Sequence, residues 1–229
     1  MRRNQFLALG LILSLGLLSA CEKQEKSGAD VPDRTILSLA LKSAVGLLKP
    51  KEKPMDPRKH LTREAIDKAG TPILFVGLDS RNAYATLSPF GENRGVVTWI
   101  SSDGITLSYR GGLLVATRGL GPDLMAADTG QALAAVRSGS GSYVRIYDYL
   151  DGEDQAVRRS FVCTAKNAGA ETIEIYGLKF TLRKVVENCN NPEFQIRNTY
   201  WVSNRNRIRQ SKQWIGPDIG YVFSQQLSR

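Results

Sequence analysis

Histidine and cysteine are scarce in this chain, and their scarcity limits the chemistry that it can carry out. The sequence of 229 residues contains one histidine, His60, and three cysteines. A Ser-His-Asp triad needs a histidine held rigidly beside its nucleophile, whereas His60 lies in a Lys- and Pro-rich segment that is typical of a linker. A metal site that combines His60 with the distant cysteines is also disfavoured. We therefore expect no catalytic residue, metal or cofactor; a polysaccharide-modifying enzyme with paired carboxylates, such as Asp148 and Asp151, is the less favoured alternative.

No apolar run is long enough to span a bilayer, but one near the start is typical of a secretory signal. Residues 6–18 are apolar over about 13 positions, short of the ~20 that a transmembrane helix needs, and Arg2 and Arg3 precede them. The run closes on Leu18-Ser19-Ala20-Cys21. This ending resembles the lipobox of bacterial lipoproteins, which implies removal of residues 1–20 and attachment of acyl chains such as palmitate to Cys21.

The expected lipid anchor and the positive net charge predict a cellular location and a class of partner. Two or more acyl chains anchor a protein stably, and Glu22, where an Asp would favour the inner membrane, favours the periplasmic face of the outer membrane. The chain has a formal net charge of +9, and only Arg2 and Arg3 of its basic residues leave with the signal. The periplasm holds no genomic DNA, so we expect no nucleic-acid partner. Anionic polysaccharide, lipid head groups or an acidic protein are the natural partners of a basic protein there.

Two thiols, Cys163 and Cys189, remain once Cys21 is lipidated. In an oxidising compartment a single pair has only one connectivity, so the sequence predicts a disulfide between them. The β-rich runs around the two cysteines predict two further strands between them.

The hydrophobic pattern divides the mature chain into three parts. Residues 21–35 have no apolar period and are typical of a flexible tether. Residues 36–70 are expected to be helical, with an amphipathic helix over 36–48 and a short helix that is capped by Thr62 and ended by Gly70. Residues 71–229 contain short β-rich runs separated by turn signals. We expect a mainly β fold, an antiparallel meander that forms a sandwich or partly open barrel after one or two N-terminal helices.

The expected strands share β-rich composition and spacings of about 8 to 12 residues. They are residues 73–78, 83–87, 96–100, 105–109, 113–117, 143–150, 157–164, 172–176, 179–186, 194–202, 208–213 and 221–224. Residues 122–127 are expected to form a short helix because Pro122 suits a first-turn position. The free N–H groups of that helix could hold an anion, although a structural role is favoured.

Four segments together resemble the YjbF/GfcB family of lipoproteins. They are WISSDGITL at residues 99–107, LLVATRGLGPDL at 113–124, YWV at 200–202 and SKQWIGP at 211–217. The resemblance spans most of residues 70–223 and includes the lipobox and the paired cysteines. It implies an outer-membrane lipoprotein with an antiparallel β fold that acts in production or export of exopolysaccharide or group 4 capsule. It carries over no catalytic residue.

A tyrosine stripe is the first candidate binding surface. Residues 143–150 alternate between an aliphatic set, expected inside, and a set with Tyr143, Arg145, Tyr147 and Tyr149, expected to be partly exposed. Tyrosine rings on an exposed face could stack on sugars. The favoured alternative is a tyrosine row packed under a neighbouring element. Trp99 and Trp214 are expected in the core.

A hairpin of residues 194–203 and 207–214 is the second candidate. With a three-residue loop at 204–206, Trp201 would oppose Arg209, and Ser203 would oppose Arg207. One face would then be apolar, and Asn206 would take the left-handed conformation that such loops require. The two faces are predicted as follows: Ile196, Tyr200, Val202, Ile208 and Trp214 inside, and Arg197, Trp201, Arg207, Arg209 and Gln213 outside. Guanidinium groups beside an aromatic ring suit an acidic polysaccharide, and a solvated basic face is the alternative.

These observations predict a non-enzymatic, lipid-anchored component of an exopolysaccharide or capsule system. The β domain would engage the polymer, an export or assembly protein, or both. A lipid-handling carrier with an apolar cavity is the rival, although the strands show no surplus of apolar residues on both faces to line one.

Overall fold

The computed structural model of this chain describes residues 56–228, and the sheet that they form is continuous. The predicted signal, lipidated Cys21, tether and amphipathic helix over residues 36–48 lie outside the described residues. The helical elements are η1 (Pro57–Lys59), α2 (Arg63–Lys68), η2 (Asp79–Arg81) and α3 (Gly130–Ser138). The strands are β1 (Leu74–Leu78), β2 (Ala83–Asn93), β3 (Val96–Ile100), β4 (Thr106–Arg110), β5 (Leu113–Arg118), β6 (Leu124–Ala127), β7 (Ser140–Leu150), β8 (Ala156–Ile175), β9 (Leu178–Asn190), β10 (Gln195–Val202), β11 (Ile208–Gly216) and β12 (Gly220–Gln226).

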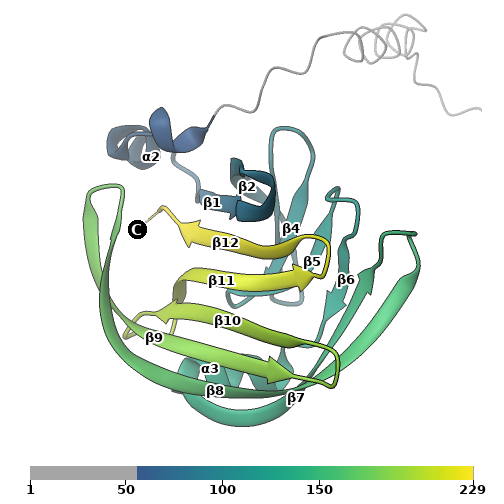
Figure 1. Cartoon of the computed structure of the whole chain (residues 1–229). Coiled ribbons are helices and arrows are strands. Elements are labelled where there is room, and N and C mark those ends of the chain that lie inside the picture. Colours follow the sequence, from purple (N-terminus) through teal and green to yellow (C-terminus); the bar gives the residue numbers. More distant parts are fainter. Residues whose placement is uncertain (1–55, 229) are drawn as a thin grey trace, which may run out of the picture. The chain divides into compact units, whose positions relative to one another are not determined.

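The twelve strands form one antiparallel sheet in the order β5-β4-β3-β2-β1-β12-β11-β10-β9-β8-β7-β6. Each strand pairs with its sequence neighbour, except that β1 pairs with β12 and the two edge strands, β5 and β6, do not pair. Because these edges are consecutive in the chain, the sheet curls into a nearly closed barrel (Figure 1). The predicted fold class, mainly β with a partly open antiparallel barrel, is confirmed. None of the described helices has the length and apolar character needed to cross a membrane.

Side chains fill the interior of this barrel. Trp99 and Trp214 are buried as predicted, and Trp214 contacts the rings of Tyr147, Tyr149 and Phe161 edge-on. A small, partly open cavity beside Trp99 has a volume of about 20 Å³, room for about one water molecule. An acyl chain does not fit there, which disfavours the lipid-carrier alternative.

The N-terminal helix of the described region is capped as the sequence predicts. The Thr62 hydroxyl accepts a hydrogen bond from the Ala65 N–H at 3.2 Å at the start of α2. Gly70, with φ +66°, follows the helix in the left-handed conformation that glycine adopts without steric cost.

The helix predicted over residues 122–127 is wrong, because this segment holds strand β6. The buried Asp123 carboxylate accepts hydrogen bonds from the Thr117 hydroxyl and from the Gly119 and Leu120 N–H groups, which fixes a turn. The anion site proposed for that helix is therefore absent from this segment. The helix missed by the sequence analysis is α3, which buries Ala132, Ala135 and Val136.

Strand β8 is one continuous strand where the sequence predicts two. A bulge between Asn167 and Ala170 absorbs the glycine-containing segment that resembles a turn. The pairing of β8 with β9 extends to Ile175↔Leu178, whereas β10 pairs with β9 only as far as Arg183. Residues 170–182 therefore project as a two-stranded arm, which rises beside the ends of β11 and β12 in Figure 1.

Arg63 fastens the tip of this arm to the rest of the fold. Its guanidinium donates hydrogen bonds to the carbonyl oxygens of Ile175, Tyr176 and Leu227 at 2.9 to 3.1 Å. Ile66, Phe75, Ile175 and Leu227 form a second apolar cluster beneath the arm. The arm is thus held by helix α2 and by the outer face of the sheet.

The predicted disulfide is present, and it joins neighbouring strands. Cys163 on β8 lies directly opposite Cys189 on β9, with their Cα atoms 4.0 Å apart. The prediction of two strands between the cysteines is wrong because β8 is continuous.

We expect the disulfide to stabilise the fold. Its cysteines are separated by 26 residues, which corresponds to about 3.5 kcal/mol in the chain-entropy model. Urea unfolding of a Cys163→Ala/Cys189→Ala variant should show a loss of about that size. Mass spectrometry of the non-reduced protein should find neither thiol free, and complete alkylation of both without reductant would contradict the bond.

Candidate functional site

The β10–β11 hairpin has the predicted loop but a different register beyond it. The Ser203 N–H donates to the Arg207 carbonyl at 2.9 Å, and Asn206 has φ +56°, so the three-residue loop and its left-handed asparagine are confirmed. Val202 then pairs with Ile208, but Trp201 pairs with Gln210. Arg209 is the extra residue of a bulge, and the predicted pairing of Trp201 with Arg209 is wrong.

The bulge changes which hairpin side chains reach the surface. The predicted apolar set is buried: Ile196, Tyr200, Val202, Ile208 and Trp214. Gln213, expected outside, is also buried, and its amide bonds to the Leu114 N–H and the Gly112 carbonyl. Arg197 and Arg207 are exposed as predicted.

Arg207 and Arg209 line an open groove of about 460 Å³ between the arm and the β10–β11 loop. We call it the basic groove. Its lining residues are Leu178, Lys179, Phe180, Ser203, Asn204, Arg205, Arg207 and Arg209. Four of these side chains are cationic and none is acidic, so the groove has one sign of charge.

Arg209 is the most constrained cation of the basic groove. Its predicted position on the exposed face is wrong, because the bulge leaves the residue only 7% exposed. Its guanidinium carbon lies 4.7 Å from the centre of the Phe180 ring. Burial lowers the pKa of Arg209, and the nearby charges of Arg207 and Arg63 lower it further. Among the described residues, no carboxylate forms an ion pair with any of the four groove cations. An incoming anion would relieve this repulsion without displacing a partner.

The other predicted binding residues of the hairpin lie elsewhere. The Trp201 ring has the Lys184 ammonium 5.4 Å from its centre, and Lys184 forms an ion pair with Glu171 at 2.8 Å. Arg197 lines a separate groove with Asn188, Asn190, Gln195, Ile196 and Tyr221. The structure therefore groups Arg207 and Arg209 with Lys179, Arg205 and Phe180. Sequence reasoning missed Lys179 and Phe180 because only the fold brings β9 beside this loop.

The expected exposure of the tyrosine stripe is wrong, because Tyr143, Tyr147 and Tyr149 face the barrel interior. The favoured alternative, a packed tyrosine row, is closer to the structure, although the row packs inside the barrel. These tyrosines are 6%, 1% and 3% exposed, whereas Val144 between them is 53% exposed. The reason is Arg145, which shares the tyrosine face and finds its partner, Glu187, inside the barrel.

The buried Arg145–Glu187 pair lies in a network of side-chain hydrogen bonds. Their nearest nitrogen and oxygen atoms are 2.9 Å apart. The carboxylate also accepts hydrogen bonds from the Tyr143 and Tyr200 hydroxyls and from the Asn198 amide at 2.6 to 2.8 Å. Burial raises the pKa of Glu187, but the charge of Arg145 and these hydrogen bonds outweigh it and hold the pKa below its usual range.

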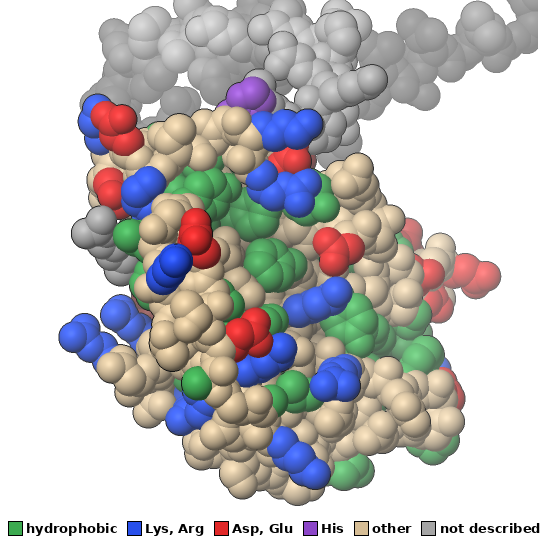
Figure 2. All heavy atoms as spheres, turned by 60° about the vertical axis from the view of Figure 1, so that its left-hand side comes forward, with side chains coloured by type: hydrophobic (Ala, Val, Ile, Leu, Met, Phe, Trp, Pro, Cys, Tyr) green, Lys and Arg blue, Asp and Glu red, His purple; other side chains and the backbone are tan. Residues whose placement is uncertain are grey.

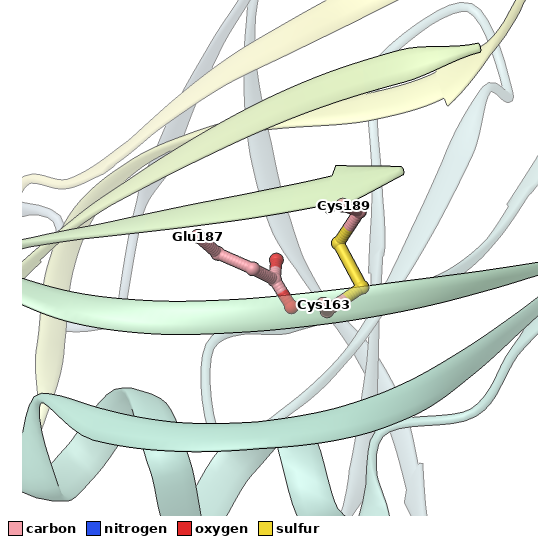
Figure 3. A group of neighbouring side chains, drawn as sticks. All are labelled: Cys163, Glu187 and Cys189. Carbon is pink, nitrogen blue, oxygen red and sulfur yellow. A yellow bond between two sulfur atoms is a disulfide. The ribbon is translucent and has the colours of Figure 1, made fainter. Parts of the chain in front are cut away.

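Glu187 also lies beside the disulfide, as Figure 3 shows. Carboxylate and thiolate groups in one cluster are a typical metal-ligand set. Here the sulfur atoms of Cys163 and Cys189 are bonded to each other, and the carboxylate is occupied by Arg145 and its hydrogen-bond donors. The sulfur and oxygen atoms that could bind a metal therefore already have structural partners.

Comparison with solved structures defines the class of fold. A crystal structure of the hypothetical lipoprotein YmcC from Escherichia coli (K12) superimposes with a TM-score of 0.65 at 18% identity. The match covers 88% of this chain and 98% of that chain. The fold is therefore one that a bacterial lipoprotein adopts. No curated protein matches the chain significantly.

The family follows from the sequence. A family model described as group 4 capsule polysaccharide lipoprotein gfcB, YjbF, matches residues 37–227. The chain belongs to this family of capsule-related lipoproteins, which confirms the resemblance.

The Arg145–Glu187 pair predicts a pH-dependent stability. Because the folded-state pKa of Glu187 is lowered, its contribution is complete above the unfolded value of about 4.5 and is lost as the pH falls through the folded value. Glu187→Gln, which leaves Arg145 buried without its counter-charge, should lower the free energy of unfolding at pH 7 by about 3 to 5 kcal/mol.

Urea unfolding between pH 3 and pH 7 measures both effects. The difference between wild type and Glu187→Gln should shrink at the acid end. Glu193→Gln, which removes an exposed carboxylate, is the matched control and should change stability little. A Glu187→Gln variant as stable as wild type at pH 7 would refute the role of the pair.

Proposed function

We propose that this protein is a lipid-anchored, non-enzymatic component of capsule or exopolysaccharide production that binds an acidic polysaccharide through the basic groove. Acyl chains on Cys21 would hold it at the periplasmic face of the outer membrane. The β domain would present the polymer to, or receive it from, export or assembly proteins of the same system. Membership of a family of capsule polysaccharide lipoproteins supports the link to the polymer.

The observation that carries the proposal is a cluster of cations with which no carboxylate of the described residues forms an ion pair. Arg205, Arg207, Arg209 and Lys179 line one groove without an acidic side chain. A guanidinium binds a carboxylate through two parallel hydrogen bonds. The groove is open, so a polymer can lie along it with its ends in solvent. Repeated carboxylates on one chain would then bind with a high effective concentration.

The surroundings of the carboxylates and the histidine that a catalytic site would use support a binding role without catalysis. Asp148 is half-buried and paired with Arg158 at 2.6 Å, and Asp151 accepts backbone hydrogen bonds from Glu153 and Gln155 in a turn. Their carboxylates therefore have structural partners. His60 is exposed at the end of η1 and does not line the basic groove.

Charge reversal in the basic groove tests the function. Arg207→Glu/Arg209→Glu should weaken binding of the acidic polysaccharide purified from the producing strain by about 100-fold. This corresponds to about 1.4 kcal/mol for each of the two lost arginine–carboxylate contacts. Titration calorimetry of the mature lipoprotein in detergent measures this affinity. Arg81→Glu/Lys166→Glu changes the charge equally at exposed positions outside the groove and should retain near-wild-type affinity.

The same variants can be tested in cells that lack the chromosomal gene. The groove variant should be folded and reach the outer membrane yet restore little surface polymer, whereas the control variant should restore it. Normal polymer export with Arg207→Glu/Arg209→Glu would remove the groove from the function. Shortening of the polymer by the purified protein would overturn the non-enzymatic assignment.

A further inference from the structure

A second hollow borders the arm, and four of its nine lining residues are aromatic. It has a volume of about 400 Å³, and we call it the aromatic cleft. Its lining residues are Arg58, Phe75, Asp79, Tyr84, Glu174, Tyr176, Lys212, Phe223 and Gln225. Figure 2 shows hydrophobic side chains gathered on the face where the arm comes forward, with charged side chains around them.

The floor of the aromatic cleft is built on the outer face of the sheet. The Phe75 ring meets Phe223 edge-on at 6.3 Å between centres and stacks on Tyr84 at 6.2 Å. Gly77 allows this arrangement, because a Cβ atom there would lie 2.9 Å from the Tyr84 ring. The Arg58 guanidinium covers Tyr84 at 3.5 Å. Phe223 and Tyr176 are both half-exposed and line the cleft.

The rim of the cleft carries hydrogen-bonding groups of both signs. Lys212 and Asp79 are 3.4 Å apart and largely exposed, and Glu174 is exposed on the arm. Gln225 adds an amide, whereas the Tyr176 hydroxyl oxygen is buried without a hydrogen-bond partner among the described residues, so Tyr176 offers its ring to the cleft. This mixture differs from the uniformly basic groove. It matches a ligand that has apolar faces and many hydroxyl groups and carries no charge.

We propose that the aromatic cleft binds uncharged sugar rings of the same polysaccharide whose acidic groups occupy the basic groove. This inference rests on the proposed function. Sugar C–H faces would pack on Phe223 and Tyr176, and sugar hydroxyls would bond to Lys212, Glu174 and Gln225. The arm joins the two sites, because Glu174 and Tyr176 border the cleft while Lys179 and Phe180 border the groove. A polymer that crosses the arm would contact both.

Binding of a polymer without charged groups distinguishes the contribution of the aromatic cleft from that of the basic groove. The probe is the polysaccharide of the producing strain, used in its native form and with its carboxyl groups reduced to alcohols. Calorimetry with the mature lipoprotein should show that the reduced polymer still binds and that added salt has little effect, because no ion pair contributes. Arg207→Glu/Arg209→Glu should leave this affinity unchanged while it weakens binding of the native polymer.

Two variants test the cleft. Phe223→Ala removes an aromatic contact and should lower affinity for the reduced polymer about tenfold. Phe90→Ala, which removes a 70% exposed ring outside the cleft, is the matched control and should have no effect. Lys212→Ala/Glu174→Ala removes two exposed rim groups without changing the net charge and should lower affinity about tenfold. This second variant decides the question if Phe223→Ala fails to fold.

The outcomes distinguish this inference from the proposed function. Failure of the reduced polymer to bind, or wild-type affinity for it in the folded cleft variants, overturns the aromatic cleft as a sugar site and leaves the basic groove untouched. Cleft-dependent binding of the reduced polymer, combined with undiminished binding of the native polymer to the groove variant, supports the cleft and overturns the groove.

Discussion

The pairing of β8 with β9 sets the geometry on which both surface hollows depend. The two strands pair from Val162↔Asn190 to Ile175↔Leu178, well beyond the point where β10 stops. The disulfide fixes Cys163 opposite Cys189 at one end, and a one-residue slip would turn each side chain to the other face. The projecting arm places Lys179 and Phe180 opposite the β10–β11 loop and Tyr176 over the outer face of the sheet.

A buried polar network within the barrel supports the strands on which the two hollows lie. The Arg145–Glu187 pair lies between β7 and β9, and donors from Tyr143, Asn198 and Tyr200 complete its hydrogen bonds. A buried pair adds little net stability compared with apolar packing, but the loss of one partner is costly. Such a network therefore favours one arrangement of β7, β9 and β10 over alternatives that would leave Arg145 unpaired. The basic groove and the aromatic cleft therefore lie on strands whose register the buried network helps to fix.

The sequence predicted the local features of the fold better than its long-range contacts. Alternation and turn residues located most strands, and Asn206 correctly indicated a three-residue loop with a left-handed residue. Alternation also assigned Val144 to the interior, because a strand pattern does not show that Arg145 will find a carboxylate 42 residues away. The glycine-containing segment of β8 resembled a turn because a bulge and a turn use the same residues. In the candidate site, Arg207 and Arg209 were identified, but their neighbours on β9 depend on pairing that no local pattern reveals.

In the function that we propose, the basic groove holds acidic sugar without altering it. Side-chain NMR of the arginines tests this most directly, in a titration of the mature lipoprotein with acidic oligosaccharides cut from the strain's polymer. We expect saturable shifts of the Arg207 and Arg209 guanidinium resonances, with no change in oligosaccharide length over the titration. Shifts confined to arginines outside the groove, such as Arg197, or progressive shortening of the oligosaccharides, would contradict it.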